Sequence, residues 1–231
     1  PELKAVICNA EMIKQEIIDD FGVPADKITV IYNAIDNQKF LPANAEQRQQ
    51  LRQQYQIPQQ AHCLIFVGSG FERKGLTAAI RAVAATDSYL LVVGKDKAEK
   101  RYQALAQSLG CSERVRFMGV QKQTLPFYQA ADALLLPTLY DPFPNVILEA
   151  MSCGLPVITS TTCGGAEFIT QGQNGFVTDA LDVPALIEAI TALPRQAQGS
   201  TMGEAARLRI MSATPAHLSE QLISLYNRLL D

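Results

Sequence analysis

Hydrophobic residues gather in short runs along the chain, and a segment with helical spacing follows most of these runs. The runs are short enough for buried strands, and they lie at Cys63–Val67, Tyr89–Val93, Val115–Met118, Ala133–Leu136 and Val157–Thr159. The segments between them predict helices over Leu76–Ala85, Ala98–Leu109, Leu125–Ala131 and Val146–Cys153. Apolar strands that alternate with helices indicate an α/β fold, a Rossmann-like, doubly wound parallel sheet with helices on both faces.

Other segments flank this alternation on both sides. Before it, a helix is predicted at Ala10–Phe21 and a strand at Ile28–Tyr32. The Gln-rich segment Asn44–Gln56 is predicted to be a solvated helix. After it, three segments predict a helical C-terminal tail, at Pro184–Leu193, Gly203–Met211 and His217–Leu230.

Composition narrows the class of protein. The chain has 231 residues, 48% of them hydrophobic, and a net charge of −3, which argues against a nucleic-acid partner because duplex binding needs a basic face. No apolar run is long enough to span a bilayer. The five cysteines are odd in number and widely spaced, and His62 and His217 lie far apart. We therefore expect reduced thiols of a cytosolic protein, with neither a disulfide framework nor a metal site.

Glycines and charged residues follow the predicted strands at their carboxyl ends, where doubly wound sheets bind ligands. Gly68-Ser69-Gly70, Gly94-Lys95, Gly119 and a loop around Asp141 stand at these positions. The dinucleotide fingerprint is absent because Arg73 occupies the place of its third glycine, and no Walker-type phosphate loop is present. A hydride-transfer enzyme and a Walker-type NTPase are thus disfavoured.

Arg73 and Lys74 lie together at the mouth of the helix predicted from Leu76. Two cations at a helix N-terminus oppose the macrodipole, whereas a bound anion would reverse the sign of that interaction. The pattern favours a phosphate site, and the alternative is an ordinary solvated pair on the surface.

Glu149 is a carboxylate in the otherwise apolar run Val146–Met151. Pro142 and Pro144 keep the preceding loop extended, so the helix is predicted to begin near Asn145. A buried carboxylate is costly unless it is paired or hydrogen-bonded, and a vicinal diol is one natural partner. The alternative is a hydrogen bond or ion pair within the fold.

In this order and spacing, the motifs resemble the C-terminal domain of retaining glycosyltransferases with the GT-B fold, in the group that includes lipopolysaccharide-core glucosyltransferases. The resemblance covers nearly the whole chain. The stretches that carry it are "KITVIYNAIDNQKF", "VGSGFERKG", "VRFMGV", "DPFPNVILEAMSCGLPVITS" and "CGGAEFI". Asp141 stands at the first place of the family's glutamate–seven residues–glutamate element, and Glu149 stands at the second.

The resemblance implies roles for individual residues. Lys74 would bind the donor diphosphate, and Arg73 would substitute for a family arginine whose position is Ser69 here. Glu149 would hold the ribose hydroxyls, and Asp141 would contact hydroxyls of the donor sugar. The remaining site residues are grouped by their partner: Gly68, Ser69 and Gly70 beside the phosphates, the amides of Phe143, Asn145 and Val146 facing sugar or phosphate, and Gly119 and Val120 in a loop that reads the base, expected to be uracil.

The resemblance also implies an activity and a domain plan. A hexose would pass from a UDP-linked donor to a glycan or lipid-linked hydroxyl with retained configuration, without metal or other cofactor, in lipopolysaccharide or other envelope glycan synthesis. Residues 1–42 would form the interdomain segment and the start of the C-terminal domain, and residues 43–231 the nucleotide-sugar-binding domain. The acceptor domain would lie outside this chain, so the chain alone should be inactive.

The resemblance also bears on where the protein lies in the cell and on which other functions the same contacts could serve. The family resemblance implies a cytoplasmic protein, held peripherally at the inner face of the membrane, if at all, through the acceptor domain. A nucleotide-sugar epimerase on the same scaffold would share the diphosphate and ribose contacts, and a non-enzymatic nucleotide-binding module would lack turnover altogether.

Overall fold

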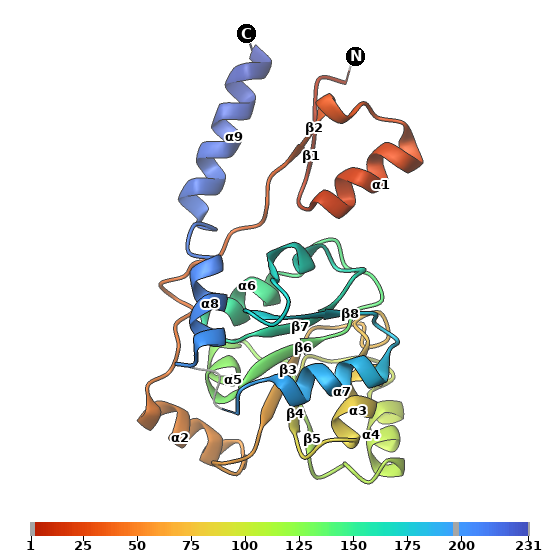
Figure 1. Cartoon of the computed structure of the whole chain (residues 1–231), viewed down its shortest axis with the longest axis vertical. Coiled ribbons are helices and arrows are strands. Elements are labelled where there is room, and N and C mark those ends of the chain that lie inside the picture. Colours follow the sequence, from red (N-terminus) through yellow and green to blue (C-terminus); the bar gives the residue numbers. More distant parts are fainter. Residues whose placement is uncertain (1–2, 196–198, 231) are drawn as a thin grey trace.

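A computed structural model describes residues 3–195 and 199–230, and its main body is a parallel sheet of six strands in the order β5-β4-β3-β6-β7-β8 (Figure 1). The strands are β3 (Cys63–Val67), β4 (Tyr89–Val93), β5 (Val115–Gly119), β6 (Ala133–Leu136), β7 (Val157–Ser160) and β8 (Gly175–Thr178). The connecting helices are α3 (Leu76–Ala84), α4 (Glu99–Ser108), α5 (Leu125–Ala130), α6 (Asn145–Ser152) and α7 (Val183–Ala192). The predicted α/β, Rossmann-like sheet is confirmed.

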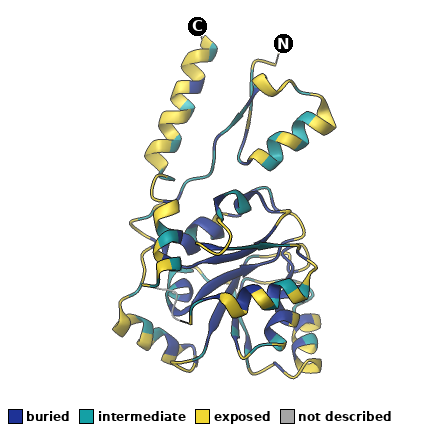
Figure 2. Ribbon diagram, viewed as in Figure 1, coloured by how far each residue is buried: buried dark blue, intermediate teal, exposed yellow. Residues whose placement is uncertain are grey.

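The helices divide between the two faces of the sheet. α3 packs against α4 and α7, and α5 packs against α6 (Figure 1). All residues of β3, β6 and β7 are buried, as is all of β4 except Tyr89, so the core follows the strands (Figure 2). Each large apolar side chain buried in this way contributes about 1.5–3 kcal/mol, which makes the sheet the rigid frame for the loops at its edge.

A smaller unit of the chain stands apart from this sheet. It consists of a two-stranded parallel sheet of β1 (Val6–Cys8) and β2 (Ile28–Val30), with α1 (Glu11–Phe21) and the short 3-10 helix η1 (Ala25–Lys27) between them. The C-terminal helices α8 (Thr201–Arg209) and α9 (Pro215–Leu230) run from the main sheet toward it (Figure 1). The Lys4 ammonium donates to the carbonyl oxygen of Leu229 at 2.9 Å, which ties α9 to this unit.

The helix α2 (Ala45–Gln54) lies where a solvated helix was predicted, but one of its charged side chains is buried. Arg52 is 1% exposed, and its guanidinium donates to Asp132 at 2.7 Å and to the carbonyl oxygens of Ala130, Pro58, Gln59 and Ala61. Asp132, fully buried, also accepts from Arg48 at 2.6 Å. The prediction was wrong for this face because a guanidinium can be buried once all its donors are bonded.

The five cysteines are free and buried, as expected for reduced thiols. Burial raises the pKa of the Cys63 thiol to about 12, so that it stays protonated. Across the described residues, no helix combines the length and apolar character that crossing a membrane requires.

Candidate functional site

Three of the predicted site residues meet at the carboxyl ends of β3 and β6. The Lys74 ammonium lies 2.6 Å from Asp141 Oδ2, and the Arg73 guanidinium lies 3.1 Å from the same oxygen. Lys74 and Asp141 are buried, whereas the Arg73 side chain is half exposed. Asp141 lies 67 positions after Lys74 and 68 after Arg73 in the sequence. The two cations and the carboxylate therefore form one cluster with a net charge of +1.

Backbone contacts between two loops hold this cluster together. The carbonyl oxygen of Arg73 accepts from Leu139 N at 2.7 Å and from the Thr138 hydroxyl at 2.9 Å. Gly75 then starts α3 with a φ of 79°, and a Cβ on it would lie 1.7 Å from the Pro137 oxygen, so only glycine fits. Lys74 thus sits just before the N-terminus of α3, the end at which a helix carries partial positive charge on its free amides.

The glycine-rich strand ends form the floor beside Lys74. Gly94 N donates to the Gly119 oxygen at 2.8 Å, and a Cβ on Gly94 would lie 2.0 Å from the Gly68 oxygen. The Lys74 side chain lies over Gly68, at 3.3 Å from the position of an added Cβ. Ser69 and Gly70 are exposed beside this floor. Glycine at Gly68 and Gly94 thus lets the strand ends and the Lys74 side chain pack closely together, and the approach of a ligand to this backbone stays a prediction.

Glu149 lies in a separate part of the site and is only partly buried, so the helix that carries it is not buried on every side. Its Oε2 accepts from the Tyr128 hydroxyl at 2.8 Å and the Thr124 hydroxyl at 3.3 Å. It lines a cavity of about 400 Å³ together with Lys39 and Lys122. Within the described chain, no hydrogen bond is recorded on Oε1, which leaves that oxygen able to accept from a ligand.

Burial and the nearby Glu149 carboxylate raise the pKa of Tyr128 well above its ordinary value. The hydroxyl therefore remains a donor to Oε2 at any physiological pH. Tyr128 and Thr124 were not predicted as site residues. No signal in the sequence links them to Glu149, because Tyr128 lies on α5 and Thr124 just before it, whereas Glu149 lies on α6.

The other predicted residues lie at the start of α6 and at the end of β5 with the loop that follows it. Phe143 is buried just before α6, and Asn145 opens that helix, where its side-chain oxygen accepts from Asn33 at 2.7 Å. Val146 follows in the first turn. Val120 is 63% exposed in the loop after β5, at the side of the sheet where Gly119 ends the strand. Across the part of the chain that is described, no bond joins Glu149 to the Lys74 cluster, and no group of three His, Cys, Asp or Glu side chains could hold a metal ion.

Glu167 is a further charged residue that sequence reasoning missed. Its carboxylate accepts from the backbone N–H of Glu11 at 3.0 Å and Met12 at 2.9 Å, and from the Tyr32 hydroxyl at 2.7 Å. The preceding Ala10 gives α1 no side-chain cap. An alanine at a helix start was the available signal that the cap comes from elsewhere in the chain.

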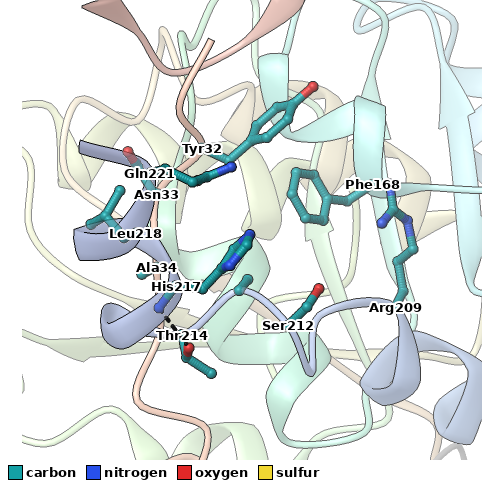
Figure 3. A pocket seen from close by; sticks show the side chains of 11 residues that line it. Tyr32, Asn33, Ala34, Phe168, Arg209, Ser212, Thr214, His217, Leu218 and Gln221 are labelled. Carbon is teal, nitrogen blue, oxygen red and sulfur yellow. Dashed lines mark hydrogen bonds between the residues drawn. The ribbon is translucent and has the colours of Figure 1, made fainter. Parts of the chain in front are cut away.

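Residues that follow β2 and residues at the junction of α8 with α9 line a cavity of about 140 Å³, whose lining side chains are drawn in Figure 3. The Tyr32 and Phe168 rings, which both line it, pack edge to face with their centroids 5.1 Å apart (Figure 3). Arg209 lies over the Phe168 ring at 4.8 Å. The cavity adjoins the segment that joins the small unit to the main sheet, and none of its residues was predicted as a ligand contact.

The fold is that found in GT-B glycosyltransferases. The family profile described as "Glycosyl transferases group 1" matches residues 47–209, and that described as "Glycosyltransferase Family 4" matches residues 1–39. The chain belongs to the glycosyl transferases group 1 family.

Individual relatives agree with this membership. Lipopolysaccharide core biosynthesis glycosyltransferase LpsE of Rhizobium meliloti (strain 1021) is 31% identical over 186 residues, 80% of this chain and 52% of LpsE. Lipopolysaccharide glucosyltransferase WaaG of Escherichia coli (strain K12) is 38% identical over 136 residues, 56% of this chain and 36% of WaaG. The structure of Anabaena Alr3699/HepE in complex with UDP-glucose matches with a TM-score of 0.85 at 24% identity, over 97% of this chain and 64% of that one. This chain thus spans about half or less of these curated relatives.

Proposed function

We propose that this chain is the donor-binding half of a retaining hexosyltransferase that takes its sugar from a UDP-linked donor. The acceptor would be a hydroxyl of a glycan or lipid-linked glycan in lipopolysaccharide or other envelope synthesis. The acceptor-binding domain would be a partner of this chain, and the chain by itself would bind the donor without transferring sugar.

The observation that carries this proposal is the buried Lys74 ammonium, set before the N-terminus of α3 over the Gly68 and Gly94 floor. Arg73 adds a second cation at the same place. Ammonium, guanidinium and helix amides together make a site for a diphosphate. A lysine that is only 8% exposed does not fit the alternative of an ordinary solvated pair on the surface.

The remaining groups fit the other parts of a nucleotide-sugar. Glu149 Oε1 would accept from the ribose hydroxyls in the cavity that Lys39 and Lys122 share. Asp141 would accept from hydroxyls of the sugar, and the amides at the start of α6, from Phe143 to Val146, would face sugar or phosphate. The loop at Gly119 and Val120 would contact the base.

The same groups suit the chemistry of transfer. When the bond from the sugar to the diphosphate breaks, negative charge grows on the leaving phosphate. Lys74, Arg73 and the α3 amides are fixed in place to stabilise that charge, which lowers the barrier without reorganisation. These cations can supply the stabilisation that a divalent metal supplies elsewhere, so we propose a metal-independent reaction. WaaG is named a lipopolysaccharide glucosyltransferase, and HepE was solved with UDP-glucose, which supports a UDP-hexose as donor.

A thermal-shift panel of nucleotide-sugars tests this function. A ligand that binds only the folded state raises the Tm, so UDP and UDP-hexoses should stabilise the chain more than uridine or ADP-sugars. The same preparation should transfer no sugar to an added acceptor. Absence of any shift with all nucleotides at millimolar concentration would instead favour a non-enzymatic module, and epimerised product from the full-length protein would identify an epimerase.

A further inference from the structure

We propose that Asp141 acts as the internal counter-ion of the phosphate-binding cations, so that the site favours an intact nucleotide-sugar over a free nucleoside diphosphate. This inference rests on the proposed function, because it assigns a regulatory property to the same donor site. It concerns discrimination between donor and product, which the assignment of donor contacts leaves open.

One carboxylate oxygen of Asp141 accepts hydrogen bonds from both cations. Lys74 Nζ at 2.6 Å and Arg73 at 3.1 Å converge on Oδ2. The Asp141 side chain is only 8% exposed, and its backbone is fixed because Asp141 N donates to Thr162 O at 3.1 Å and Asp141 O accepts from Gly164 N at 2.9 Å. The carboxylate therefore cannot swing far from the two cations.

The other carboxylate oxygen of Asp141, Oδ1, is able to accept a hydrogen bond from a ligand. In the described ranges, 3–195 and 199–230, no hydrogen bond is recorded on Asp141 Oδ1. Glu149 shows the same division, with Oε2 bonded from within and Oε1 not. Both carboxylates of the element thus keep one oxygen able to accept from hydroxyl groups.

A diphosphate bound at this place would contact the same two cations as Asp141. It would share Lys74 and Arg73 with a carboxylate and meet a net charge of +1 instead of +2 from these three residues. Like charges close together repel, and they do so more strongly at a partly buried site than in bulk water. Asp141 therefore weakens the binding of a free nucleoside diphosphate.

An intact nucleotide-sugar donor recovers part of the binding free energy that the Asp141 charge removes. Its sugar brings hydroxyl donors next to the diphosphate, and a hydrogen bond from a hydroxyl to an ionised carboxylate is stronger than one between neutral groups. The product that remains after transfer lacks these donors, so it binds more weakly and leaves more readily.

Titration calorimetry of this chain with UDP and with UDP-glucose tests the inference. Asp141→Asn removes the charge, and Asp141→Ser removes it without adding an amide donor. Either variant should bind UDP about tenfold more tightly than the unaltered chain, with a smaller gain or a loss for UDP-glucose. Asp141→Glu keeps the charge and should show no such gain for UDP.

Glu72→Gln is the matched control for a general charge effect. Glu72 lies one residue before Arg73 but faces Arg101, at 3.8 Å, and is exposed. This variant should change the affinity for either ligand by less than about twofold. The inference is overturned if the unaltered chain binds UDP and the folded charge-removing variants bind it equally or less tightly, or if Glu72→Gln gives the same gain. If neither the unaltered chain nor any variant binds UDP or UDP-glucose, the proposed function itself is overturned, and the inference with it.

Discussion

The Tyr32 hydroxyl donates a hydrogen bond of 2.7 Å to the Glu167 carboxylate, across 135 positions of sequence. The same carboxylate accepts the first two amides of α1. Burial and the Glu167 carboxylate raise the pKa of Tyr32, so its hydroxyl stays protonated as the donor. One acidic residue after β7 thereby fixes both the helix of the small unit and the segment that leads from it.

We expect Glu167→Ala to loosen α1 more than it destabilises the main sheet. An N-terminal cap contributes about 0.5–2 kcal/mol, and the remote cap is lost with the carboxylate. Hydrogen exchange should accelerate over residues 11–21 while β3, β6 and β7 stay protected. Tyr32→Phe leaves the α1 amides capped and should spare that exchange. Equal exchange in α1 before and after Glu167→Ala would contradict the capping role.

Lys74→Ala and Arg73→Ala should each weaken UDP binding and barely change uridine binding. Hydrogen bonds to charged groups are worth about 1.5–3 kcal/mol, or roughly tenfold to a hundredfold in affinity. The buried Lys74 should show the larger effect and the half-exposed Arg73 the smaller. Calorimetry with both ligands measures this, and Lys100→Ala, on the exposed face of α4, is the control. Equal losses for UDP and uridine would mean that the cations support the fold instead.

Glu149→Gln should weaken UDP binding while the Tm of the chain without nucleotide stays unchanged or rises. The amide oxygen of glutamine can still accept from Tyr128 and Thr124, so the internal bonds survive and only the charge is lost. The loss should shrink with 2′-deoxy-UDP, which offers one hydroxyl fewer. A clear drop in Tm with unchanged UDP affinity would make Glu149 a structural residue.

Acid should destabilise the chain through His62, which is 4% exposed and whose pKa is lowered chiefly by burial. Below a pH of about 6.5, the unfolded chain binds a proton at this residue that the folded chain does not. The free energy of unfolding should therefore fall as pH drops from 7.5 to 5.5, by at most about 1.4 kcal/mol per pH unit from this group. Above that range His62 is neutral in both the folded and the unfolded chain, so it adds no pH dependence there.

His62→Gln should flatten that pH dependence, measured by urea unfolding at each pH. His217→Gln is the control, because the His217 side chain is 54% exposed. An unchanged slope in His62→Gln would assign the acid sensitivity to other groups.

Asp132→Asn should be the most destabilising of these changes. It leaves the buried Arg52 guanidinium without its counter-charge, and breaking a buried pair costs about 3–5 kcal/mol. Asp87→Asn breaks the exposed Asp87–Arg195 pair and should cost less than about 1 kcal/mol. Urea unfolding of both variants decides it, and similar losses would show that the buried pair adds no more than a surface one.

The strands β3, β4, β6 and β7 could be predicted because their burial on both faces leaves continuous apolar runs. Val157–Thr159 differs from β7 by one residue. β8 was missed, since it starts at a glycine and its other three residues, Phe176 to Thr178, are only partly buried. β1 was missed because only Cys8 in it is buried. Edge strands and strands of a small sheet carry little hydrophobic signal.

For the site, the sequence placed Lys74 and Asp141 at strand ends but gave no sign that they would pair. A contact across 67 positions depends on which strands are neighbours, and β3 lies beside β6 in the sheet. The partners of Glu149 were equally invisible, because Tyr128 approaches it from a different helix. Composition and spacing indicate which groups do chemistry, whereas their pairing follows from topology.

The strand order has a consequence during synthesis on the ribosome. β3 pairs with β4 on one side and β6 on the other. The half-sheet β5-β4-β3 can form once residue 119 has emerged, whereas the second edge of β3 stays bare until β6 follows. That edge belongs to Cys63–Val67, whose five residues are all buried in the finished fold. A bare apolar edge is a template for pairing with other chains. A nascent chain that ends between residues 119 and 133 is therefore the form of this protein that depends most on chaperones.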